Sequence, residues 1–205
     1  MKLSSRQEQI LEILQENKRA SVNKLSEILF FSKMTIRRDL AYMEKCGFLT
    51  RYHGGAIIKQ NYLQYPIEMR RHIHEKEKLK MAELADKHIE DDQVIFLPGS
   101  STCSFIIPYL KNYEDLHIVT NSVKFMLQLS KMQVKCTLSG GEYNESQHIL
   151  VGRSCERFFR SINTDIAIVS CDGISDDGII SVSNEKTAEI VMIGLKNASK
   201  KNSPC

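Results

Sequence analysis

The sequence lacks several features that mark whole classes of protein. Its 205 residues include no tryptophan, no low-complexity tract and no apolar run long enough to cross a membrane. Six cysteines are present, but none forms a C-x-x-C pair, and His72 and His74 lie too far from any of them to suggest a zinc site. No apolar segment follows the first few residues, so we expect no secretory signal. These absences favour a cytoplasmic protein with reduced thiols, no metal, no cofactor and no membrane partner.

Charge is unevenly distributed along the chain. Residues 1–60 contain 11 Lys or Arg and 6 Asp or Glu, a net charge of +5, whereas the remaining residues carry a net charge of −2. A chain of this length can form one small domain and one of ordinary size, each with its own core. The basic segment is the part suited to contact a polyanion.

The segment that begins at Ser32 predicts a helix with one apolar side and one cationic side. Ser32 is a good N-cap residue, because its hydroxyl can accept a hydrogen bond from an amide of the first helical turn. Ile36, Leu40 and Met43 then recur at spacings of four and three, which places them on one buried face. The basic residues of the segment fall outside that face.

Two shorter apolar patterns precede this helix. Residues 10–14 and 22–29 predict two amphipathic helices separated by a short connection, and the second ends near Phe30 and Phe31. Followed by the helix at Ser32, they predict a helix-turn-helix unit in which the third helix is the recognition helix. Residues 48–58 then predict a hairpin around Gly54-Gly55, which would form a wing.

The recognition helix and the wing carry the residues that we expect to contact double-stranded DNA. Cations and hydroxyls can fix the register on phosphates, while side chains in the major groove read base edges. A charged helix face is more often only solvated, but a capped third helix with two helices before it and a basic wing after it favours DNA binding. The predicted contacts are Ser32, Lys33, Met34, Thr35, Arg37, Arg38, Arg51, His53 and Gly54.

The remainder of the chain predicts a second domain. Residues 59–74 lose periodicity and are interpreted as a linker between a DNA-binding domain at 1–58 and a domain at 75–205. After an expected helix from Glu75 to Ile89, short apolar runs alternate with helical segments; the runs are 94–97, 117–120, 134–138 and 166–169. This alternation is typical of a parallel sheet covered on both faces, whose ligands bind beyond the carboxyl ends of the strands.

Polar loops follow these predicted strands. The first is Gly99-Ser100-Ser101-Thr102, with a helix expected at 105–110, and its amides, hydroxyls and helix N-terminus suit a phosphate group. An ordinary strand-to-helix turn would have the same pattern, so the loop alone does not decide between the two. The other strand ends carry Asn121-Ser122, Gly140-Gly141 and Asp172-Gly173, a set that fits a small polyol phosphate.

Many of these residues occur at the offsets found in DeoR-type repressors of sugar metabolism. In the first domain the resemblance rests on Arg6, Ile10, Leu14, Ser32, Thr35, Ile36, Arg37, Arg38, Asp39, Leu40 and the wing at 51–56. It continues through the Gly-Ser-Ser-Thr loop and through 119–122, 140–141, 150–152, Asp165, 172–173 and 184–185, and so covers nearly the whole chain. Because an acid in a DNA-facing helix would repel phosphate, we expect Asp39 to point inward and pair with Arg6.

The resemblance implies an N-terminal winged helix-turn-helix (α+β) and a C-terminal α/β parallel-sheet sensor domain similar in fold to ribose-5-phosphate isomerase. It implies a homo-oligomeric transcriptional repressor that leaves its DNA operator when a phosphorylated sugar binds. On the same ground, the phosphate is expected on Gly99, Ser100, Ser101 and Thr102, and the sugar on Asn121, Asp172 and, more weakly, Glu185.

Two departures from the family pattern keep alternatives open. Pro98 stands where the family has an acid, and the chain ends soon after a helix expected at 184–199, which predicts a shortened sensor domain with an open sheet edge. One alternative is a DNA-binding protein with a silent sensor domain. Another is a sugar-phosphate isomerase or deaminase with Asp172 or Glu185 as base, but the cation that isomerisation needs is missing after Asp176-Asp177. The leading hypothesis is therefore a regulator without catalytic residues.

Overall fold

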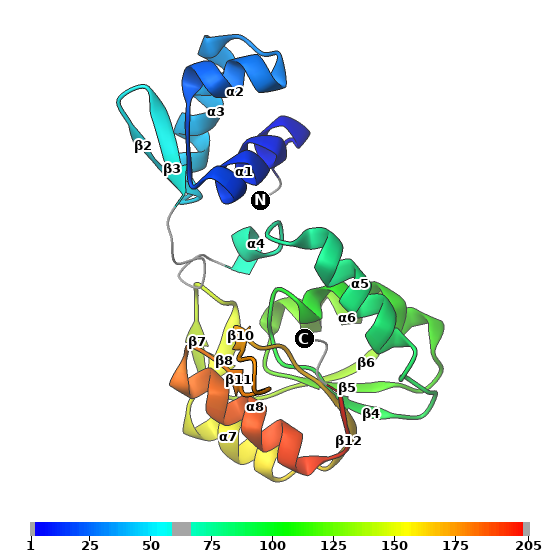
Figure 1. The fold of residues 1–205 in the computed structure, drawn as a ribbon. Helices are drawn as coiled ribbons and strands as arrows, with labels where there is room; N and C mark the ends of the chain where they lie inside the picture. The colour runs from blue at the N-terminus through cyan, green and yellow to red at the C-terminus, as the bar shows by residue number, and fades with distance from the viewer. Residues whose placement is uncertain (1–2, 59–66, 203–205) are drawn as a thin grey trace. The chain divides into compact units, whose positions relative to one another are not determined.

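A computed structural model of the chain describes residues 3–58 and 67–202. The chain divides into two compact units between Ile73 and His74, and each unit is described by itself (Figure 1). The first half of the stretch expected to be a linker, 59–66, lies outside the described residues, and its second half contains the short helix α4 (Ile67–Arg70). Among the helices that the structure describes, none has the length and apolar character needed to cross a membrane.

Before the short helix α4, the first unit contains three longer helices and a small antiparallel sheet. These elements in chain order are α1 (Ser5–Asn17), β1 (Arg19–Ser21), α2 (Val22–Leu29), α3 (Lys33–Lys45), β2 (Leu49–Tyr52) and β3 (Gly55–Ile58). Strand β3 pairs with both β2 and β1, which gives the order β1-β3-β2. The predicted helices and hairpin are confirmed. Strand β1 lies where the sequence indicated only a connection, because three residues are too few to show a period.

One hydrophobic core holds the three helices together. Ile10, Leu25 and Ile36, one from each helix, are fully buried in it. Gly47 has a φ of +83°, and this left-handed conformation, which glycine adopts without strain, ends α3. The apolar spacing that predicted the buried face of α3 is thus realised in the packing.

The second unit is an α/β domain. Its helices and strands are α5 (Glu75–Asp86), β4 (Val94–Phe96), β5 (His117–Thr120), α6 (Val123–Lys131), β6 (Lys135–Leu138), β7 (Glu142–Asn144), β8 (Ile149–Val151), α7 (Arg153–Arg160), β9 (Thr164–Ile168), β10 (Gly173–Ile174), β11 (Ile180–Ser181), α8 (Glu185–Asn197) and β12 (Ala198–Asn202). Five strands form a parallel sheet in the order β12-β9-β4-β5-β6. Two antiparallel pairs, β7 with β8 and β10 with β11, lie outside that sheet.

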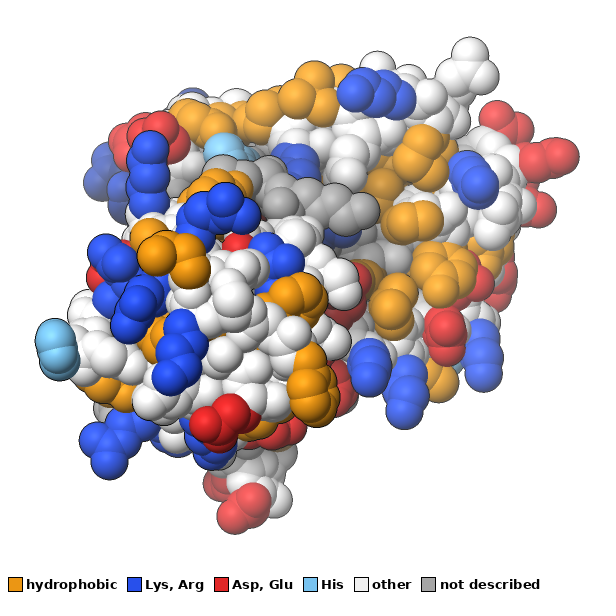
Figure 2. Space-filling model, turned by 90° about the horizontal axis from the view of Figure 1, so that it is seen from above, with side chains coloured by type: hydrophobic (Ala, Val, Ile, Leu, Met, Phe, Trp, Pro, Cys, Tyr) orange, Lys and Arg blue, Asp and Glu red, His pale blue; other side chains and the backbone are white. Residues whose placement is uncertain are grey.

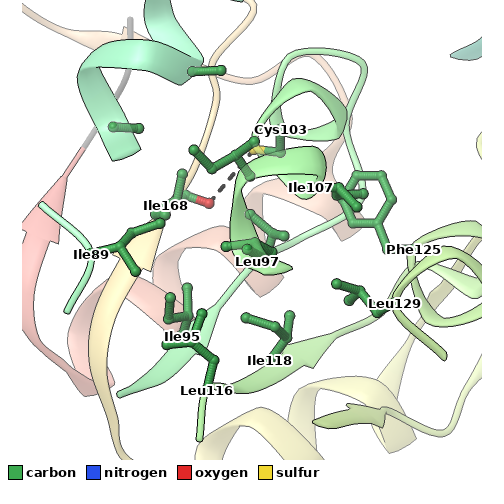
Figure 3. Close-up of a cluster of buried hydrophobic side chains, with 14 of the residues drawn as sticks. Ile89, Ile95, Leu97, Cys103, Ile107, Leu116, Ile118, Phe125, Leu129 and Ile168 are labelled. Carbon is green, nitrogen blue, oxygen red and sulfur yellow. Dashed lines mark hydrogen bonds between the residues drawn. The ribbon is translucent and has the colours of Figure 1, made fainter. Parts of the chain in front are cut away.

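Both faces of the parallel sheet are covered, as predicted. Ile95 points to the layer that contains α5 and α6 (Figure 3), and Ile166 belongs to the same core cluster. Phe96 and Ala167 belong to the cluster that contains residues of α7 and α8. Helix α8 comes close to the sheet at Gly194, where a Cβ atom would collide with the ring of Phe96. Alternate side chains of each strand therefore belong to two separate cores.

The sequence did not predict strands β7, β8, β10 and β11, and the domain differs from the prediction in two further features. The helix expected at 105–110 is instead a pair of 3-10 segments, η2 (Cys103–Phe105) and η3 (Ile107–Asn112), with Pro108 near the start of η3. Proline has no N–H to donate, and short 3-10 turns give a weaker dipole than an α-helix. The sheet edge expected to be open at β9 is occupied by β12, a strand hidden in sequence because Ala-Ser-Lys-Lys-Asn is mostly polar.

Candidate nucleic-acid interface and ligand site

Ser32 begins helix α3, as predicted. Its Oγ accepts a hydrogen bond from the backbone N–H of Thr35 at 3.2 Å and lies 2.9 Å from the Thr35 hydroxyl. The capping bond fixes the first turn of α3 and holds two hydroxyls together there. The N-terminal end of a recognition helix is the part that approaches base edges.

The cationic side of α3 is open to solvent. Lys33, Arg37 and Arg38 are all exposed, and no ion pair to any of them exists within the described residues. Met34 lies among them with 71% of its surface exposed. On the surface of the first unit, Lys and Arg side chains are interspersed with hydrophobic ones (Figure 2). Within the described residues these cations have no ion pair to break before they contact a phosphate.

Asp39 points inward and pairs with Arg6, which confirms the expected contact. Arg6 Nε lies 2.5 Å from Asp39 Oδ2, and Gln7 Nε2 donates to Asp39 Oδ1 at 3.1 Å. The hydrogen bond to this carboxylate raises the pKa of the Arg6 guanidinium. The guanidinium also lies 4.7 Å from the centre of the Phe31 ring. Arg6 of α1 therefore contacts both α3 and the turn before it.

The wing residue Arg51 is engaged within the unit. Its Nε and its backbone N–H each donate to the Glu44 carboxylate at 2.7 Å. Both bonds lower the pKa of Glu44 below its usual value of 4.5, and the bond from the backbone N–H has the larger effect. His53 and Gly54 are exposed in the two-residue turn, and Gly54 has a φ of +90°. DNA contact by Arg51 would have to use the part of the guanidinium that Glu44 leaves open, whereas the tip is free to approach a groove.

In the second unit, polar side chains at the carboxyl ends of β4 and β5 bind each other. Asn121 is 1% exposed; its Oδ1 accepts from the Gly99 amide at 2.9 Å and its Nδ2 donates to the Leu150 carbonyl at 3.0 Å. Gly99 itself has no room for a side chain, since a Cβ would collide with Ile149 and Ser122. Both groups of the Asn121 carboxamide therefore hold backbone in place, and its contact with a sugar stays a prediction.

The predicted phosphate loop has a cation beside it that the sequence did not reveal. Lys78 of α5 donates from Nζ to the Ser101 hydroxyl at 3.3 Å, while the Ser100 hydroxyl accepts from the Cys103 amide at 2.9 Å. Thr102 is half-buried in the same loop. In sequence, Lys78 is one of several charges on a helix, and only the packing of α5 against the loop distinguishes it from Lys80, which is exposed.

Asp172 is hydrogen-bonded to Ser183, two residues before Glu185. Asp172 follows β9, and its Oδ2 accepts from the backbone N–H of Ser183 at 2.8 Å and from the Ser183 hydroxyl at 2.7 Å. Glu185 is exposed in the first turn of α8, whose N-cap is Asn184. Asp172 thus fastens the segment that leads into α8, and both effector contacts stay predictions.

A cavity of about 610 Å³ opens after the carboxyl end of β6. It is lined by Gly141, Glu142, Val151, Gly152, Arg153, Ser154, Glu156 and Lys186. The lining contains charges of both signs, and Lys186 Nζ lies 3.2 Å from Glu142 Oε2. None of the residues predicted to hold phosphate or sugar is part of this lining.

Comparison with known families covers both units. Residues 6–61 match the model of the DeoR-like helix-turn-helix domain, and residues 73–202 match the model of the DeoR C terminal sensor domain. The two matches follow each other along the chain and together span most of it. They are the N-terminal and C-terminal parts that the sequence predicts.

Individual relatives agree with this assignment. The L-fucose operon activator of Escherichia coli is 32% identical over 201 residues, which cover 96% of this chain and 82% of that protein. The glycerol-3-phosphate regulon repressor of the same organism is 27% identical over 179 residues, covering 87% and 71%. Ribose 5-phosphate isomerase A from Methanocaldococcus jannaschii shares 18% identity over 63% of this chain and 51% of that one, with a TM-score of 0.46. The chain belongs to the DeoR family of DNA-binding transcriptional regulators.

Proposed function

We propose that this regulator holds operator DNA through α3 and the wing, and that a phosphorylated sugar at the carboxyl edge of the sensor sheet changes that binding. The single observation that supports the DNA contact best concerns a helix whose start is fixed by Ser32. Its cations Lys33, Arg37 and Arg38 are exposed and form no ion pair with any residue in 3–58 or 67–202. Cations without internal partners bind phosphates without first breaking an ion pair.

The genes under control are proposed to serve carbohydrate metabolism. One relative carries the name of an L-fucose operon activator and another that of a glycerol-3-phosphate regulon repressor. We expect repression, because occupancy of a promoter is sufficient for it, whereas activation needs a further surface for the polymerase. A homo-oligomer would place two winged helices on half-sites separated by whole turns of DNA.

The phosphate of the sugar is proposed to bind the loop at 99–102 together with Lys78. The Ser101 hydroxyl accepts a hydrogen bond from Lys78 Nζ, so this loop has a cation directly beside it. A lysine is a common phosphate ligand, and its charge compensates for the weak dipole of the 3-10 segment that follows. Asp172 would contact sugar hydroxyls from the neighbouring strand end.

The DNA contact is tested by selecting duplexes from a randomised library with the full chain and measuring the affinity for the selected duplex by fluorescence anisotropy at several salt concentrations. We expect a selected motif and a steep loss of affinity with salt, because each phosphate contact contributes about 0.9 to the slope of log K against log salt. A slope near zero, or no enrichment, would contradict the proposed interface.

The ligand is tested by thermal shift of the full chain against a panel of sugar phosphates and their unphosphorylated sugars. A ligand present at about a hundred times its Kd should stabilise the sensor domain by about 2.7 kcal/mol. Lys78→Met should abolish the shift, whereas the matched variant Lys80→Met should keep it. If no sugar phosphate shifts the wild-type chain, the sensor domain is silent and only the DNA-binding part of the proposal survives.

A further inference from the structure

Phe30 is the most exposed large hydrophobic residue that the structure describes. It caps the C-terminus of α2 with 92% of its surface open to solvent. Its backbone has a φ of +57° and a ψ of 35°, in the left-handed region that residues other than glycine and asparagine rarely adopt. Neither the side chain nor the backbone conformation of Phe30 is explained by packing within the unit.

The turn around Phe30 is held in place by its neighbours. The Ser26 hydroxyl donates to the Phe31 carbonyl at 2.6 Å, and the Phe31 ring lies against the Arg6 guanidinium. Phe31 is therefore 39% exposed, while the preceding ring remains in solvent. The two adjacent aromatic residues thus have different surroundings, and Phe30 is presented outward by a fixed turn.

The position of Phe30 places it beside the residues proposed to contact DNA. It precedes the N-cap Ser32 by two residues, which limits the distance between their Cα atoms to about 7 Å. Met34, also largely exposed, lies in the first turn of α3. Between Phe30 and Arg38 the sequence contains three cations and no acid.

We propose that the Phe30 ring contacts DNA at the rim of the major groove, against thymine methyl groups and the apolar faces of deoxyribose. The inference rests on the proposed function, because it assumes that α3 enters the groove. Apolar contact with thymine methyl groups is an established element of base readout, and an aromatic ring offers it without charge. Phe30 would then contribute affinity and a preference for thymine next to the cations that hold the phosphates.

Charge favours DNA over a protein partner as the occupant of this surface. Protein interfaces are enriched in aromatic residues, Met and Arg and depleted in Lys, so the deciding feature is that the segment from Phe30 to Arg38 carries three cations and no acid. Here the apolar side chains of Phe30 and Met34 are interspersed with Lys33, Arg37 and Arg38, none of which has an ion pair within the described residues. A polyanion with apolar groups between its charges matches that pattern.

The test uses substitutions that separate folding from DNA contact. Phe30→Gly and Phe30→Asn both tolerate a positive φ and remove the ring, whereas Phe30→Leu keeps an apolar side chain in the strained conformation. The full chain carries each change, and the probe is the duplex selected by the wild-type protein. We expect Phe30→Gly to raise Tm by a few degrees and yet to weaken binding about tenfold, with Phe30→Asn similar and Phe30→Leu intermediate.

Three further measurements make the outcome decisive. The salt slope should stay at the wild-type value in all three variants, because no phosphate contact is lost. Replacement of thymine by uracil in the duplex removes the methyl groups. It should reduce the DNA affinity of the wild-type protein more than it reduces the affinity of the Phe30→Gly variant. Wild-type affinity in Phe30→Gly would overturn the inference, and so would a change in oligomeric state by sedimentation, which would assign the ring to a protein contact. If the wild-type chain selects no duplex at all, the proposed function fails first and the inference fails with it.

Discussion

The two units of the chain use their polar residues in opposite ways. In the helix-turn-helix unit, Lys33, Arg37 and Arg38 are exposed and have no ion pair in the described part of the chain. In the sensor domain, Asn121 and Asp172 accept hydrogen bonds from the backbone amides of Gly99 and Ser183. The first unit has its cationic side chains on an open surface, whereas the second uses polar side chains of the predicted site to hold the backbone.

This difference explains why amino-acid patterns are more informative for the first unit. A side chain that acts from an exposed helix face is identified by its position on the helix, which the sequence contains. A side chain that acts at the edge of a sheet depends on which strands and helices pack beside it, and the sequence does not contain that directly. The same contrast predicts how the two units respond to substitution.

The largest effect is expected from Arg6→Ala. It would leave Asp39, whose side chain is 6% exposed, without its main partner, and it would remove the contact with Phe31. Loss of one partner of a largely buried pair costs about 3 kcal/mol. Calorimetry should show one transition, that of the helix-turn-helix unit, moving to lower temperature. Arg19→Ala removes an exposed arginine of the same unit and should leave both transitions unchanged; an unshifted Arg6→Ala would show that the pair does not support the fold.

A slightly smaller effect is expected in the sensor domain from Gly194→Ala. The added methyl group would collide with the ring of Phe96, and overpacking of this kind costs about 2 kcal/mol. Urea denaturation should report the loss, and the same substitution should cost less in a Phe96→Leu background, where the ring is gone. If Gly194→Ala lowered the free energy of unfolding equally in the two backgrounds, a collision with the Phe96 ring would not be the cause.

Arg38→Ala tests the open surface itself. The change should leave Tm unaltered and reduce the salt slope of DNA binding by about 1, because one phosphate contact is lost. Arg51→Ala should reduce the slope much less, since the guanidinium of Arg51 is bonded to Glu44. Anisotropy titrations at several salt concentrations compare the two. Equal reductions would mean that the Arg51–Glu44 pair opens when DNA binds.

The smallest effect is a pH dependence in the sensor domain. Burial, and to a smaller extent the charge of Lys135, lowers the pKa of His117 below its ordinary 6.5. Below pH 6.5 the unfolded chain therefore takes up a proton more readily than the folded one, so stability should fall as the pH decreases toward the folded pKa. His117→Gln should make the free energy of unfolding less dependent on pH in that window, as urea denaturation would show. Identical pH profiles would rule out His117 as the cause.

Particular elements show how far the sequence could predict the structure. The bounds predicted for α2 and β5 agree with those observed, because a capped helix and a short apolar strand carry strong local signals. Strands β1 and β12 were not predicted, since the first has three residues and the second is polar, and both exist through pairing with β3 and β9. A partner strand supplied by the fold can thus override a weak local pattern.

The candidate sites show the same limit. The pairing of Asp39 with Arg6 could be predicted, because a carboxylate in a phosphate-facing helix has a physical reason to turn inward. Lys78 could not, since its contact with Ser101 depends on how α5 packs against the loop. The sequence indicates Phe30 only as the end of a helix, because neither the exposure of its side chain nor its φ can be read from composition.

The Asn121 carboxamide bridges three parts of the sensor domain, namely the loop after β4, the end of β5 and strand β8. If the proposed ligand binds there, such a bridge would hold these segments in place beforehand, and the ligand would lose little affinity to ordering them. The same side chain would couple these segments to each other. A ligand that drew the amide of Gly99 away from Asn121 would release the neighbouring backbone segments together. Ligand binding would then cause the backbone around Asn121 to move.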